Sequence, residues 1–204
     1  MAARALRADA FASVTRIIDA ARRVFAAGDG SGSLSRIAHE AGVGIATLYR
    51  HFPTREVLAR AVYERLFATE IEPMIVEFER SDVPRRTLLD LSERLLDVIE
   101  RQPGVRSSVA DLAEVTGELL SRDTSRFAAA VRRAQAAGNI RPDLEPADIP
   151  NILTMAVAAF GGIASDAATR RRYLSLLLDG VNPAGALPLP PLPVAPDGRG
   201  ARRG

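Results

Sequence analysis

Side chains suited to nucleic-acid chemistry gather between Thr47 and His51. A threonine hydroxyl can donate to or accept from base edges, and the planar fork of Arg50 can bind guanine or a phosphate oxygen. Tyr49 and His51 add polar groups that can reach phosphates. These residue types predict contact with duplex DNA, provided that they share one exposed face.

The surrounding residues 33–52 contain the elements that would present such a face. Ser33 can cap a short helix, and Gly42 supplies the positive φ that a tight turn between two helices needs. On the second helix Leu48 and Phe52 are four residues apart, so both point inward. The pattern predicts a helix-turn-helix whose second helix exposes residues 45–47 and 49–51.

The stretch from Arg16 to Val62, and above all AGVGIATLYRHFPTREVL, resembles the DNA-binding domain of TetR-family transcriptional regulators. The resemblance implies that Tyr49 and His51 contact the DNA backbone and that Thr47 approaches the bases. Arg55, where the family usually has lysine, is expected on a phosphate. The full set of predicted DNA contacts is Ser33, Ser35, Arg36, Gly44, Ile45, Ala46, Thr47, Tyr49, Arg50, His51 and Arg55.

Two positions depart from the family pattern, because Gly44 replaces a usual serine or threonine and Ala46 often stands as glycine in relatives. The operator sequence therefore cannot be read from the chain. Alternatives also stay open for three side chains: Tyr49 could pack its ring between helices, His51 could satisfy a core polar group, and Arg50 could lie on a solvated face.

The composition argues against catalysis and cofactors. The 204 residues include no cysteine, and all 27 basic residues are arginine, so thiolate and primary-amine chemistry are both excluded. Two histidines, no Gly-x-Ser-x-Gly and no His-Glu-x-x-His make an all-α enzyme a remote alternative. No metal site is expected either: Asp29, Ser31, Ser33 and Glu40 have the spacing of a calcium loop, but Leu34 stands where that loop requires glycine.

Apolar residues follow helical spacing throughout, and glycine and proline mark the breaks. The pattern predicts an all-α fold of about nine helices, with Pro73 kinking or splitting the fourth. The expected helices are 10–27, 33–40, 45–51, 54–80, 84–102, 105–113, 115–137, 147–164 and 167–179. They divide into a helix-turn-helix domain at 1–53, a helical effector-binding and dimerisation domain at 54–182, and a Pro-rich, disordered tail at 183–204.

The resemblance also implies how the body works. The last two helices, 147–164 and 167–179, are expected to form a homodimer, and an effector is expected among apolar residues chosen from helical faces: Phe78, Leu95, Ile99, Phe127 and Met155. The predicted function is a repressor that a small-molecule effector releases from a near-palindromic operator. An activator of the same fold is the nearest alternative, and a protein-interaction adaptor using the tail a remote one.

Charge and hydropathy agree with this interpretation. Residues 1–56 hold 8 arginines against 5 acids, whereas residues 57–182 hold 16 against 19, so a basic head precedes an acidic body. The charge-free run 149–165 is too short to span a bilayer. No export signal is visible, and the expected location is the cytoplasm.

Overall fold

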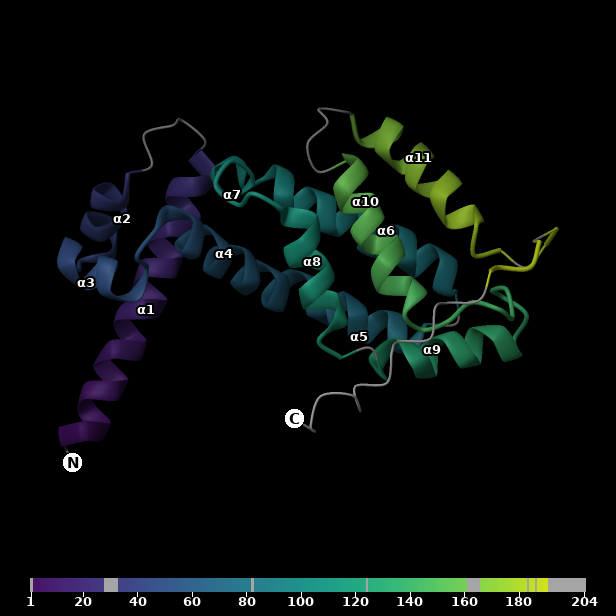
Figure 1. Ribbon diagram of the computed structural model, residues 1–204, viewed down its shortest axis with the longest axis horizontal. Coiled ribbons are helices and arrows are strands. Elements are labelled where there is room, and N and C mark those ends of the chain that lie inside the picture. Colours follow the sequence, from purple (N-terminus) through teal and green to yellow (C-terminus); the bar gives the residue numbers. More distant parts are fainter. Residues whose placement is uncertain are drawn as a thin grey trace, which may run out of the picture.

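The computed structural model describes residues 2–27, 33–81, 83–123, 125–160, 166–182, 184–185 and 187–190 (Figure 1). Every regular element in these ranges is helical, as expected. The elements are α1 (Ala2–Ala27), α2 (Leu34–Ala41), α3 (Ile45–His51), α4 (Arg55–Leu66), a π-helical segment η1 (Phe67–Ile71), α5 (Glu72–Arg80), α6 (Pro84–Glu100), α7 (Pro103–Arg106), α8 (Leu112–Ser121), α9 (Ser125–Ala136), α10 (Asp148–Phe160) and α11 (Ala167–Asp179).

The helices form a small head and a larger body, with α2 and α3 at one end of the long axis and α11 towards the other (Figure 1). In the head, α2 packs on α1 and α3 packs on α2. In the body, α8 packs against α10, and α6 against α11. A single apolar core runs from Ile17 and Leu48 in the head to Leu91 and Leu153 in the body. Helix α3 is thus supported by a continuous, packed core.

The expected break at Pro73 is present as a π-helical segment. Residues 67–71 widen the helix between α4 and α5, and the backbone N–H of Glu72 donates to the carbonyl of Phe67, five residues earlier. Pro73 follows within the first turn of α5, where its missing N–H and its ring are tolerated. The proline therefore separates two helices that the apolar pattern alone would join.

The boundaries differ from the sequence-based expectation in two regions. Helix α1 begins at Ala2 rather than near residue 10, because residues 2–9 are rich in the good helix formers alanine, leucine and arginine. The expected helices 105–113 and 115–137 are wrong in their bounds. The chain instead forms the short α7, then α8, whose first turn is capped by Asp111 accepting from the N–H of Glu114 at 2.9 Å, then α9.

In the C-terminal part the helices agree with the expectation as far as they are described, whereas the expected disorder of the tail is wrong for residues 187–190, which the loop before α10 holds by hydrogen bonds. Helix α10 ends at Phe160 in the structure, and the remaining expected residues 161–164 lie outside the described residues. Of the Pro-rich tail, residues 187–190 are extended and hydrogen-bonded to the body. Residues 191–204, including Arg199, Arg202 and Arg203, lie outside the described residues.

Candidate nucleic-acid interface

The connection between α2 and α3 is built from two caps. Ser33 accepts the N–H of Arg36 at 3.1 Å and so begins α2. Gly42 ends it at φ 62°, and its N–H donates to the carbonyl of His39 while the N–H of Val43 donates to that of Ala38. This pair of bonds is a Schellman motif, which needs a residue that tolerates the left-handed region. The predicted role of Gly42 is confirmed.

Helix α3 is held by its apolar side. Leu48 is fully buried, and Phe52, which ends the helix, is 6% exposed. Ala38 of α2 is also buried and small enough to let the two short helices approach. The inward orientation that the four-residue spacing predicted is therefore confirmed, and it fixes which side of α3 faces out.

The opposite side of α3 is exposed to solvent or only half-buried. Tyr49 is 50% exposed and Ile45 40% exposed, while Arg50 is exposed and Thr47 is half-buried. His51 is half-buried, with its ring 6.5 Å from that of Phe52. The remaining predicted contacts Ser33, Ser35, Arg36, Gly44 and Ala46 are exposed on α2 and at the start of α3. The structure thus gathers these positions at the end of the head, and their contact with DNA stays a prediction.

Arg55 has a different environment from the one the resemblance implied. It is the first residue of α4 and half-buried, its Nε donates to Ser108 Oγ at 2.9 Å, and its guanidinium carbon lies 4.7 Å from the centre of the Phe25 ring. These contacts join α1 of the head, the start of α4 and the segment after α7. Arg55 is therefore a residue of the junction between head and body, whatever else it contacts.

Gly104 lets the helices of the same junction pack closely. Ser108 Oγ also lies 2.6 Å from the carbonyl of Gly104, and a Cβ at Gly104 would stand 2.8 Å from the Cα of Phe25. Only a residue without a side chain lets α7 approach α1 this closely. Sequence reasoning missed Phe25, Gly104 and Ser108 as a unit because they are far apart in the chain, and no local pattern connects them.

Polar contacts also fasten α4 to α8. Arg60 pairs with Glu118, Arg122 lies 3.2 Å from Glu64, and Tyr63 Oη lies 2.7 Å from Thr116 Oγ1. Tyr63 is 1% exposed, and burial raises its pKa to about 12, although the hydrogen bond with Thr116 opposes part of that rise. The helix that leaves the head is thereby fixed to the middle of the body.

The raised pKa of Tyr63 makes the fold sensitive to high pH. Because the folded pKa lies above the ordinary value of 10.0, the stability contributed by the neutral phenol is present below pH 10 and is lost as pH rises towards 12. We expect Tyr63→Phe to remove a late step from the tyrosinate absorbance titration and to lower the free energy of unfolding by about 1 kcal/mol. Tyr173→Phe is the control, and a late step that survives in Tyr63→Phe would contradict the assignment.

The residues predicted for the effector do not form one group. Phe78, Leu95, Ile99 and Phe127 are fully buried, and the rings of Phe78 and Phe127 lie 6.0 Å apart. Met155 is 51% exposed instead. A cavity of about 120 Å³ lies between η1, α5, α8 and α9, and of the five predicted residues only Phe127 lines it. Its other lining residues are Phe67, Glu72, Ile75, Leu119, Leu120, Arg122 and Asp123.

Three large apolar side chains on the last two helices stay exposed, and Met155 of α10 is one of them. Tyr173 and Leu176 of α11 are 50% and 55% exposed, and the Tyr173 ring stacks on Phe160 of α10 at 6.3 Å. Tyr173 and Leu176 are three residues apart and so share one face of α11, and neighbouring exposed apolar side chains commonly mark a contact with another molecule. No helix in the described part of the chain is long and apolar enough to cross a membrane.

A capped helix, a tight glycine turn and a second helix with one buried and one exposed face define a helix-turn-helix DNA-binding domain. Comparison with known proteins agrees. The profile described as bacterial regulatory proteins of the tetR family matches residues 17–62, and the C-terminal domain profile of SbtR-like transcriptional regulators matches residues 84–183. The chain belongs to the TetR family of transcriptional regulators.

Solved structures show the same relationship. A TetR transcriptional regulator from Streptomyces coelicolor is 33% identical, with 84% of this chain and 99% of that chain covered and a TM-score of 0.53. A TetR transcription regulatory protein from Mycobacterium vanbaalenii is 25% identical, with 87% and 99% covered and a TM-score of 0.53. RolR in complex with resorcinol is 20% identical, with 88% and 91% covered and a TM-score of 0.66. No curated protein matches the chain.

Proposed function

We propose that this regulator is a repressor that binds a near-palindromic operator as a homodimer and is released by a small-molecule effector. The observation that carries the DNA-binding part is the two-sided α3, in which Leu48 is fully buried while Tyr49 and Arg50 are exposed. A helix anchored on one side can enter the major groove with the other, as in other helix-turn-helix proteins. The predicted division into residues 1–53, 54–182 and 183–204 places this helix in the first unit.

The proposed dimer uses α10 and α11. Met155, Tyr173 and Leu176 present an apolar surface that a second copy would cover, and a two-fold axis there would pair two reading heads. Since α2 and α3 lie far from α11 along the long axis (Figure 1), the pairing leaves both heads free to meet successive grooves of one duplex.

The proposed effector site lies in the body. The cavity of about 120 Å³ at η1 is apolar along Phe67, Ile75 and Phe127, with Arg122 among its charged lining residues. π-helical turns often occur at functional sites, which supports the location. RolR, which shares the fold, has been solved with resorcinol bound, and we propose a small organic molecule as the class of effector here. An effector that couples to the operator by about 1–3 kcal/mol would weaken binding roughly 5- to 150-fold.

Operator binding should depend steeply on salt. If each protomer neutralises about 4 phosphates, log affinity falls with log salt at a slope near −7, which is a loss of about 10⁴ between 50 and 200 mM salt. We expect Tyr49→Ala to weaken binding to all duplexes alike, whereas Thr47→Ala changes the preference among operator variants. Gel-shift titrations on genomic fragments bound by the protein measure both effects.

The control for these variants is Val83→Ala, because Val83 is an exposed residue of the body that lies outside both the head and the proposed dimer surface. Equal, salt-insensitive binding by wild type, Tyr49→Ala and Thr47→Ala would contradict the proposed interface.

A reporter assay in a deletion strain separates the repressor from the activator, because loss of a repressor raises expression. An operator-release screen in which no small molecule weakens binding would count against the effector.

A further inference from the structure

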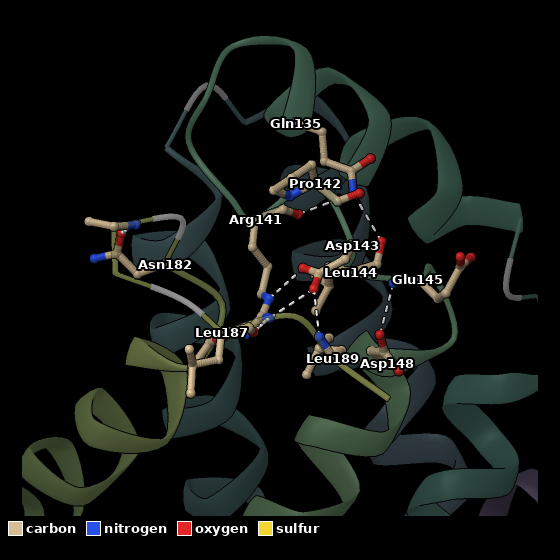
Figure 2. Close-up of polar contacts among 12 residues, drawn as sticks. Gln135, Arg141, Pro142, Asp143, Leu144, Glu145, Asp148, Asn182, Leu187 and Leu189 are labelled. Carbon is tan, nitrogen blue, oxygen red and sulfur yellow. Dashed lines mark hydrogen bonds and ion pairs between the residues drawn. The ribbon is translucent and has the colours of Figure 1, made fainter. Parts of the chain in front are cut away.

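An ion pair between a buried arginine and a partly exposed aspartate lies in the loop between α9 and α10 (Figure 2). The Arg141 side chain is only 8% exposed, and it binds Asp143 through two bonds, Nε to Oδ1 at 2.6 Å and a terminal nitrogen to Oδ2 at 2.9 Å. Gln135 of α9 fixes the loop around the pair, because the carbonyls of Arg141, Pro142 and Leu144 lie 3.0–3.2 Å from its Nε2 and share its two hydrogens. The pair is therefore a rigid, preorganised feature.

The pair uses its remaining hydrogen-bonding capacity on backbone groups from two other segments. Arg141 donates from its backbone N–H to the carbonyl of Val181 at 3.0 Å and from its guanidinium to that of Gly180 at 3.2 Å, just after α11. It also donates to the carbonyl of Leu187, and Asp143 Oδ2 accepts the N–H of Leu189 at 2.8 Å. The carbonyl and the N–H belong to residues two apart in one extended segment.

The segment is held by its backbone rather than by its side chains. Leu187 is 83% exposed, so its burial contributes little, and Leu189 is still 41% exposed. The nearly buried guanidinium of Arg141, by contrast, needs its hydrogen-bond partners, because an unpaired charge in the interior is costly. The hydrogen bonds from Arg141, and then that from Leu189, also hold the pKa of Asp143 well below its usual range, so its carboxylate is charged at neutral pH.

We propose that Arg141 and Asp143 form a clamp for an extended peptide backbone, with residues 187–190 of this chain as its occupant. The seated segment holds the end of α11 in place, because the same guanidinium binds Gly180, immediately after that helix. The consequence for assembly rests on the proposed function: α11 carries Tyr173 and Leu176 of the proposed dimer surface, so loosening its end weakens the dimer.

Leu189→Pro in the full-length protein tests the clamp, since it removes the N–H that Asp143 accepts and suits an extended, proline-rich segment. The matched control is Leu189→Ala, which keeps that N–H and removes most of the side chain. We expect Leu189→Pro to raise amide hydrogen exchange by about 10-fold or more in peptides covering 139–145 and 174–182, because a bond to an ionised group is lost. Leu189→Ala should exchange like wild type.

A chain ending at Gly185 is the second variant, and it should behave like Leu189→Pro. Unchanged exchange in both variants, or equal changes in Leu189→Pro and Leu189→Ala, would overturn the clamp. Sedimentation over a dilution series then measures the dissociation constant of the dimer, which should rise several-fold in Leu189→Pro. Faster exchange with an unchanged dissociation constant would overturn the link to assembly. A wild type that is monomeric throughout would refute the proposed dimer, while the exchange contrast would still test the clamp.

Discussion

Gly104→Ala is expected to lower the free energy of unfolding by roughly 2–3 kcal/mol, because the new methyl has no room. A Cβ at this position would stand 2.8 Å from the Cα of Phe25 and 2.9 Å from its Cβ. The obstructing atoms include backbone of α1, so a change of rotamer cannot relieve the overlap, and α7 must move away from the head. Urea unfolding measures the loss, and a gel shift measures the accompanying fall in operator affinity.

Gly117→Ala is the matched control for this substitution. It adds the same methyl on α8, where the nearest atom is Thr154 Oγ1 at 3.2 Å, the end of a side chain. The tight contact there is offset by the gain of about 1 kcal/mol that alanine brings over glycine in a helix. We expect its unfolding to stay within about 1 kcal/mol of wild type. A Gly104→Ala protein as stable as Gly117→Ala would show that α7 is not wedged against α1.

The junction around Gly104 also shows what local sequence reasoning could not supply. Arg55 and Ser108 are 53 residues apart, and their hydrogen bond depends on how α4 and α7 pack, not on either local pattern. The resemblance gave Arg55 a phosphate as partner, and the structure adds the Phe25 ring and Ser108. Such contacts follow from the tertiary arrangement, which helical periodicity leaves undetermined.

The helix-turn-helix was predictable because its signals are local. A cap at Ser33, a left-handed turn at Gly42 and the four-residue spacing of Leu48 and Phe52 each act within a few residues, and all three agree with the structure. The boundary before α8 had a local signal as well, since Asp111 and Glu114 have the spacing of a helix cap and the first turn that follows. The sequence analysis missed this boundary because apolar residues continue on both sides of Asp111.

Met155 illustrates a different limit. Helix α10 is apolar on two sides: Leu153 and Val157 face the core, while Met155 faces out. Periodicity reveals that a residue lies on an apolar stripe, but it does not say whether the chain itself or a second molecule covers that stripe. The sequence therefore suggested an internal pocket residue, and the exposure of Met155 makes it a candidate for the subunit contact.

The second large effect is expected from Leu48→Ala, which should cost about 2–5 kcal/mol because it leaves a cavity beneath α3. Leu48 is fully buried and is the buried residue within this short helix. A helix of this length has little stability of its own, so packing must hold it. Urea unfolding should register the loss, and operator binding should fall with it because the exposed face is no longer presented in one orientation.

Leu48→Met is the matched control, because it keeps the volume of the buried side chain. We expect it to lower the free energy of unfolding by less than about 1.5 kcal/mol. Sedimentation of Leu48→Ala adds a second control: the proposed dimer surface at Tyr173 and Leu176 lies on another helix, so self-association should persist while DNA binding is lost. Wild-type stability and operator affinity in Leu48→Ala would mean that α3 is positioned by something other than its buried side. In that case the exposure of Tyr49 and Arg50 would no longer imply a fixed reading face.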